Sequence, residues 1–170
     1  MTRVLGVLAA ILLILLSAAP VLAGSKPEKI PDVLADPQVF PAGEVCDFDL
    51  EMVVDLDKGK SIVFPPAEDG SQRILVSGHI VSTVTNLKTG KHATYNISGP
   101  GTFTYGDTLK VDASGTWLFF NFAGDAGGPG MWLSTGESRL EIDLSDGHWL
   151  SFSPARNTVD VCASLGGAHA

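Results

Sequence analysis

The sequence predicts an all-β fold: a single antiparallel domain of about eight to ten strands, either closed into a barrel-like shape or packed as a sandwich. Three observations support this prediction. Every even position from Cys46 to Leu56 is apolar while most odd positions are acidic, and this period of two is typical of a half-buried strand. Short runs rich in β-branched and aromatic residues then recur between Gly, Asp, Asn and Pro. No segment after the apolar N-terminus shows a sustained helical period.

These runs give the expected strand positions, and turn chemistry separates them. The hairpin turn at 86–91 contains Gly90, where a left-handed conformation is needed, and Gly78 marks a bulge or a close backbone contact inside a long run. The expected strands lie at 46–56, 61–64, 73–85, 93–98, 102–105, 108–113, 116–122, 131–135, 139–144 and 149–152, and a last run ends at Cys162.

The N-terminus has the features of a secretory signal peptide. Arg3 precedes an unbroken apolar run over 4–16, and Val21-Leu22-Ala23 provides small residues for cleavage after Ala23. The alternative is a membrane anchor, but an apolar helix of this run spans only about 20 Å, short of the ~30 Å hydrocarbon core. We therefore expect residues 1–23 to be removed and the mature protein to be secreted and extracellular, without a membrane partner.

The rest of the chain divides into three parts. Four prolines in residues 24–44 disfavour helix and central strand, so we expect a flexible lead-in there. The antiparallel domain is expected over 45–163, followed by a tail of small residues at 164–170.

The chain has two cysteines, and an exported protein meets oxidising conditions in which a disulfide is their default state. Cys46 lies in the first clear strand and Cys162 in the last, so a bridge between them would link the two ends of the domain. The loop-entropy model gives such a bridge about 4–5 kcal/mol.

Charge limits the classes of partner. Eleven Lys and Arg residues oppose 19 Asp and Glu residues, a net charge of −8. A surface of this sign argues against nucleic acid and against anionic membranes.

The most suggestive catalytic string is Gly124-Asp125-Ala126-Gly127-Gly128-Pro129, which resembles the signature around the nucleophile of chymotrypsin-like proteases. Ala126 occupies the place of the serine, and alanine has no hydroxyl to attack a carbonyl. We therefore expect a Gly-rich loop and no protease activity.

No other motif predicts a catalytic or metal site, so we expect neither and no cofactor. Asp55 and Asp57 resemble the start of a calcium loop, but Pro66 stands where its bidentate Glu would be. The four histidines, at 79, 92, 148 and 169, show no metal-binding spacing. His79 or His92 together with a carboxylate remains an alternative as an acid–base pair.

The run from Trp117 to Phe122 loses the alternation of its neighbours and is apolar on both faces. One interpretation is that Trp117, Phe119, Phe120 and Phe122 line an apolar cavity or a subunit contact. The other is a central strand whose outer face is covered by the lead-in or by a loop.

Several motifs, read in order along nearly the whole mature chain, resemble a group of small secreted proteins of unknown function that are common in actinobacteria. The resemblance implies an exported β fold with a Cys46–Cys162 pairing, and it implies no reaction or substrate. Its motifs are the export signal, Cys46-Asp47-Phe48, the hairpin Thr85-Asn86-Leu87-Lys88-Thr89-Gly90-Lys91, Gly127-Gly128-Pro129-Gly130 with Thr135-Gly136, and Asp160-Val161-Cys162.

Taken together, these observations favour a secreted, non-catalytic β-domain that binds another protein, a cell-wall glycan or a small apolar ligand. Two alternatives remain: a barrel-type isomerase or hydrolase that uses a histidine–carboxylate pair, and a structural cell-surface protein.

Overall fold

The computed structural model describes residues 27–31 and 37–170, so the predicted signal peptide lies outside the described residues. The described residues form antiparallel strands in three sheets and one short helix, α2 (Val161–Ser164). The all-β prediction is confirmed. None of the sheets in the described part of the chain closes into a barrel, so the barrel-like alternative is wrong and the sheets pack face to face.

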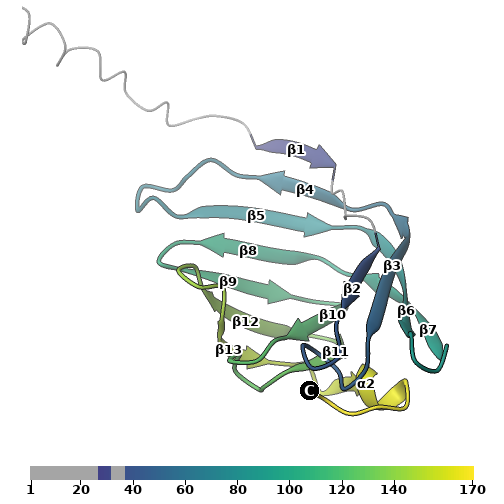
Figure 1. Cartoon of the computed structure of the whole chain (residues 1–170). Coiled ribbons are helices and arrows are strands. Elements are labelled where there is room, and N and C mark those ends of the chain that lie inside the picture. The colour runs from purple at the N-terminus through teal and green to yellow at the C-terminus, as the bar shows by residue number, and fades with distance from the viewer. Residues whose placement is uncertain (1–26, 32–36) are drawn as a thin grey trace, which may run out of the picture.

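The largest sheet has seven strands and runs across the view in Figure 1. In spatial order its strands are β1 (Glu28–Pro31), β4 (Lys60–Val63), β5 (Gln72–Ser77), β8 (Gly101–Tyr105), β9 (Thr108–Ala113), β12 (Ser138–Asp143) and β13 (Trp149–Ser153).

Two smaller sheets complete the fold. The four-stranded sheet has the order β2 (Gln38–Phe40), β3 (Leu50–Asp57), β6 (His79–Asn86) and β7 (His92–Ser98). The three-stranded sheet has the order β10 (Thr116–Asn121), β11 (Gly130–Thr135) and β14 (Asn157–Asp160).

The seven- and four-stranded sheets share three bent strands. Each of the pairs β3/β4, β5/β6 and β7/β8 is separated by only one or two residues, and the antiparallel pairing continues across the bend, from Asp57↔Ile80 to Lys60↔Ser77. Figure 1 shows the result: β3, β6 and β7 leave one side of the large sheet and run in a different direction. Strands that switch sheets in this way form the corner of an orthogonal packing.

Glycine makes this corner sterically feasible. A Cβ at Gly78 would lie 2.6 Å from the Cα of Gly59, and a Cβ at Gly99 would lie 1.9 Å from the carbonyl oxygen of Ser114. Such close approach of two backbones leaves no room for a side chain. The prediction of a close contact at Gly78 is therefore confirmed.

The three-stranded sheet lies between the other two. One of its faces joins a core cluster with the large sheet, and its other face joins a cluster with the four-stranded sheet and the C-terminal segment. The buried members of the first cluster are Val111, Ala113, Phe119 and Leu140, and those of the second are Phe40, Val45, Cys46, Phe48, Leu50, Val84, Met131, Val161, Cys162 and Leu165.

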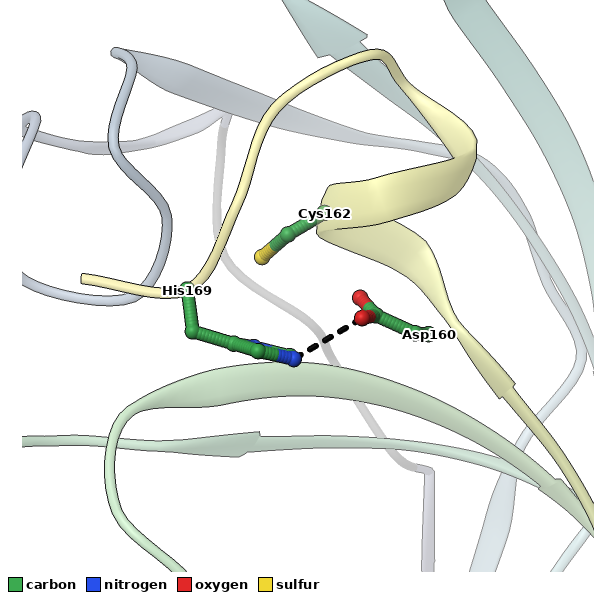
Figure 2. Close-up of side chains that lie close together, drawn as sticks. All are labelled: Asp160, Cys162 and His169. Atoms are coloured by element: carbon green, nitrogen blue, oxygen red, sulfur yellow. Dashed lines mark ion pairs between the residues drawn. The ribbon is translucent and has the colours of Figure 1, made fainter.

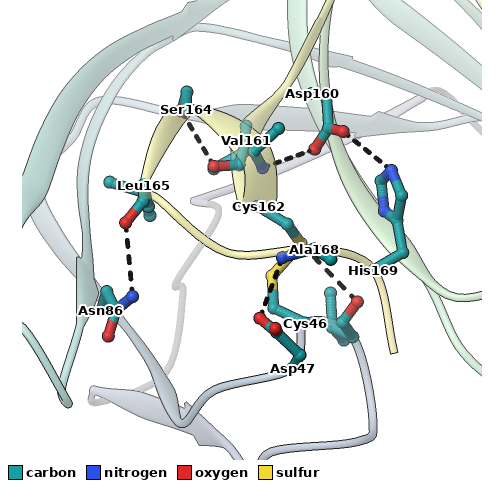
Figure 3. The surroundings of a disulfide bond; sticks show 12 residues. Cys46, Asp47, Asn86, Asp160, Val161, Cys162, Ser164, Leu165, Ala168 and His169 are labelled. Atoms are coloured by element: carbon teal, nitrogen blue, oxygen red, sulfur yellow. Dashed lines mark hydrogen bonds and ion pairs between the residues drawn. A yellow bond between two sulfur atoms is a disulfide. The ribbon is translucent and has the colours of Figure 1, made fainter.

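A disulfide between Cys46 and Cys162 joins the region of the first long strand to the end of the chain, as expected (Figure 3). Cys46 lies in a turn segment before β3, and Cys162 lies in α2 just after β14, so neither is inside a long strand. The predicted strand at 46–56 begins only at Leu50. Cys46 and Phe48 are apolar because they pack into the core around the bridge.

The structure also differs from the sequence prediction in strand number. The described residues contain fourteen strands, because each bent strand counts twice and because β1 and β2 lie in the segment where we expected a flexible lead-in. Both are short strands at sheet edges, where proline is tolerated. The C-terminal tail is ordered too: His169 forms a β-bridge with Cys46, and Leu165 is buried.

Candidate ligand-binding cavity

A cavity of about 450 Å³ lies inside the corner between the seven- and four-stranded sheets. It is partly open to solvent. Ten of its lining residues carry large apolar side chains: Met52, Val54, Ile74, Val76, Ile80, Ile97, Phe103, Trp117, Leu118 and Phe120. Ligand pockets in proteins commonly have this size and this apolar character.

The position of the cavity follows from the layering of the sheets. The three-stranded sheet lies between the other two sheets and separates them, and β10 is one of its two edge strands. Only β10 of this sheet contributes to the cavity wall; β11 and β14 contribute nothing. The cavity therefore begins where the middle layer ends and the two outer sheets face each other without side chains that fill the space.

Among the described residues, the lining contains no carboxylate, imidazole, amine, guanidinium or thiol group. Its polar members are Gln38, Ser61, Ser77, Ser82, Tyr105 and Thr116. Chemistry that needs a general base with a pKa near neutrality, or ligands for a metal ion, has no suitable groups on this wall. Asp69 and Asp143 have pKa values below the ordinary one because the hydroxyl and backbone N–H of Ser71 and Ser145 bond to them. Asp69 is an exposed turn residue and Asp143 is the last residue of β12, and both lie outside the cavity.

Two of the polar lining residues are buried as whole residues, and their hydroxyls have no partner within the described part of the chain. Ser61 on β4 is 6% exposed and Ser82 on β6 is 1% exposed, and they come from opposite sheets. Neither hydroxyl has a hydrogen-bond partner among the described residues. The buried polar atoms that lack any partner in the described part of the chain are Asn121 Oδ1 and His169 Nδ1, and neither serine hydroxyl is one of them. The two hydroxyls therefore remain accessible from the cavity that these serines line.

The structure separates the four aromatic residues that the sequence analysis singled out. Trp117 and Phe120 line the cavity, together with Leu118 between them. Phe119 is 6% exposed and packs into the core cluster with Val111 and Leu140, while Phe122 is 36% exposed and lies outside the cavity. The lost alternation has a clear cause: β10 is an edge strand whose two faces pack against two different sheets.

Most of the cavity wall carried no distinctive sequence signal. Its residues on β3, β5, β6 and β7 are ordinary inward-facing positions of alternating strands. Alternation shows that such side chains point inward, but it does not show whether anything packs against them.

The structure gives the proposed acid–base pairs no support. His79 and His92 are exposed, and within the described residues neither contacts a carboxylate; the His92 ring lies 3.3 Å from the carbonyl oxygen of Gly90. His148 and His169 do pair with carboxylates, Asp125 and Asp160, but none of the four histidines lines the cavity.

Asp160, Cys162 and His169 bring potential metal-ligand atoms within 4.8 Å of one another (Figure 2). The sulfur of Cys162 is bound to Cys46, so it has no thiolate to offer. Asp160 already accepts a hydrogen bond from the N–H of Ala163 and lies 2.8 Å from Nε2 of His169. This cluster is better explained as a contact that holds the C-terminal tail in place. The His169 ring in this tail also stacks on Trp132.

Asp55 and Asp57, the residues that resemble the start of a calcium loop, each make hydrogen bonds within the protein. Asp55 accepts from the Thr83 hydroxyl, and Asp57 accepts from the N–H of Gly59 at 2.7 Å. These bonds occupy carboxylate oxygens that a calcium ion would need.

No known protein family matches the chain, and neither a curated protein nor a solved structure matches it. The suggested kinship with small secreted actinobacterial proteins therefore stays a prediction. In the described part of the chain, no helix has the length and apolar character needed to cross a membrane.

Proposed function

We propose that the mature protein is an exported, non-catalytic binding module that holds a small apolar ligand in the cavity between its sheets. The cavity itself carries this proposal. Protein cores are close-packed, and a void of about 450 Å³ gives up the packing contacts of every side chain around it unless something occupies it. Water gains little from a wall that is mostly apolar, whereas an apolar ligand restores those contacts.

The wall supports binding over catalysis. The described residues of the wall offer apolar side chains and a few neutral polar groups, and none of them is suited to proton transfer or metal binding. The disulfide indicates an oxidising environment. Together with the N-terminal leader, it supports function outside the cell.

The proposal is tested with a neutral fluorescent probe, N-phenyl-1-naphthylamine, added to the protein without its leader. The double variant Val54→Phe/Val76→Phe adds bulk to the cavity from both sheets. We expect the wild-type protein to enhance the fluorescence of the probe, and the double variant to bind it at least tenfold more weakly because the space is filled.

The matched control is Val53→Phe/Leu75→Phe, which places the same side chains on the same two strands at neighbouring positions outside the cavity lining. This control should bind the probe like the wild type. Absence of probe binding by the wild type, or equal binding by both double variants, would contradict the proposal. Circular dichroism verifies that each variant is folded.

A further inference from the structure

The two unpaired serines indicate what kind of ligand the cavity takes. Ser82 lies on β6 between Ile80, which lines the cavity, and Val84, which is fully buried in the core. Ser61 provides a second hydroxyl from the opposite sheet. The described residues supply no partner to either hydroxyl, so each is available for a hydrogen bond to a molecule in the cavity.

A hydrogen-bonding group on the ligand would supply that partner. A serine hydroxyl can donate to a carbonyl or hydroxyl oxygen and can accept from a hydroxyl. A purely hydrocarbon ligand would fill the space but leave both serines unpaired. The ligand that best complements this wall is apolar over most of its length and carries at least one hydroxyl or carbonyl group.

Charge on the ligand is disfavoured in either sign. In the described part of the chain, the lining has no lysine, arginine or histidine to pair with a carboxylate or phosphate, and no aspartate or glutamate to pair with an ammonium group. The protein as a whole carries a net charge of −8, which further opposes an anion. An ionised group buried without a partner costs far more than a neutral polar group.

The volume sets the approximate size of the ligand. An engineered cavity of about 150 Å³ holds one benzene molecule. The present cavity is about 450 Å³, which by the same measure corresponds to a ligand of roughly 18 carbon atoms.

On this basis, and resting on the proposed function, we infer that the ligand is an uncharged lipid-like alcohol or ketone whose polar group hydrogen-bonds to Ser82, with Ser61 as a second polar contact. Ser61 and Ser82 are thus specificity-determining residues: they favour neutral oxygenated ligands over both hydrocarbons and fatty acids.

The test compares three ligands with the same chain length, 1-tetradecanol, 1-chlorotetradecane and tetradecanoate, by displacement of N-phenyl-1-naphthylamine at neutral pH. We expect the wild-type protein to bind the alcohol about threefold to tenfold more tightly than the chloride, the value of one hydrogen bond, and at least tenfold more tightly than the carboxylate. Ser82→Ala should lower the affinity for the alcohol by about threefold to tenfold and leave the affinity for the chloride unchanged.

Ser61→Ala is the second variant, and Ser77→Ala is the matched control because Ser77 lines the cavity but is exposed to solvent. The control should leave all three affinities unchanged. Removal of an unpaired hydroxyl should not lower the melting temperature, so a folding defect would not obscure the result.

The outcomes distinguish this inference from the proposed function. Two results would overturn the inference: tetradecanoate that binds as tightly as the alcohol, or a ratio of alcohol to chloride affinity that is unchanged in both Ser82→Ala and Ser61→Ala. If the wild-type protein still binds the probe, the proposed function of the apolar cavity is not affected by either result. Loss of the cavity function itself would appear earlier, as failure of the wild-type protein to bind the probe.

Discussion

Among single residues, Asp125 shows how a motif that suggests catalysis can serve structure instead. Its side chain is 2% exposed. Oδ2 accepts the N–H of Phe122 at 2.6 Å, and Oδ1 accepts the N–H of Trp149 at 2.9 Å and lies 3.1 Å from Nδ1 of His148. Asp125, the aspartate of the protease-like string, therefore connects the Gly-rich loop to the start of β13 by hydrogen bonds. Its role is structural, because the string contains no nucleophile.

We expect Asp125→Ala to destabilise the protein by about 3 kcal/mol, because it leaves two backbone N–H groups without their charged acceptor. Urea unfolding followed by tryptophan fluorescence measures this change. The control is Asp146→Ala, which removes an exposed carboxylate that accepts one turn hydrogen bond from His148. It should cost less than about 1 kcal/mol. Equal losses in the two variants would mean that Asp125 is only another turn residue.

At the scale of elements, the bent strands show what the sequence could and could not predict. Alternation and turn chemistry correctly predicted the strands and the hairpin at 86–91, where the Asn86 side chain accepts backbone N–H groups of the turn and Gly90 has a φ of 73°. The run 73–85 was expected as one strand, whereas the structure bends it at Gly78. The bend depends on the contact between Gly78 and Gly59, which are on different strands, and local sequence does not show such a contact.

The corner glycines provide a direct test of this architecture. Gly99→Ala should destabilise the protein by several kcal/mol or prevent folding, because its Cβ would lie 1.9 Å from the Ser114 carbonyl oxygen and the backbone would have to move. Gly106→Ala is the control: its Cβ would meet nothing within 4 Å. Thermal unfolding of both variants measures the difference. A stable, wild-type-like Gly99→Ala protein would mean that the corner does not need the close approach of the two strands.

For the whole molecule, the sequence indicated the candidate site only at β10. The aromatic run stood out because it lost its alternation, and two of its four aromatic residues do line the cavity. The other walls of the cavity could not be predicted. A cavity is a place where two sheets do not contact each other, and the sequence of a single strand does not show whether the opposite sheet contacts its inward side chains. The packing of β10 between two different sheets could not be predicted from the sequence either, because it depends on the order in which the three sheets stack.

The disulfide acts on the whole molecule because it joins residues 116 positions apart, from the segment before β3 to α2. Around it, the tail returns along the first segment: Asp47 and Ala168 exchange two hydrogen bonds, and Asn86 donates to the carbonyl oxygen of Leu165 (Figure 3). These contacts form only when the two ends of the domain are close together. The bridge lowers the conformational entropy that the chain loses when its ends come together on folding.

We therefore expect the variant Cys46→Ala/Cys162→Ala to lose about 4–5 kcal/mol of stability in the loop-entropy model, which corresponds to a fall in melting temperature of roughly 10–15 °C. Differential scanning calorimetry measures this fall. Reductant should lower the melting temperature of the wild type by a similar amount and leave the variant unaffected. Because no residue of the bridge lines the cavity, the variant should still bind the neutral probe at temperatures well below its melting point. A wild-type melting curve unchanged by reductant, with both sulfurs shown to be reduced, would mean that the noncovalent contacts of the tail hold the two ends together by themselves.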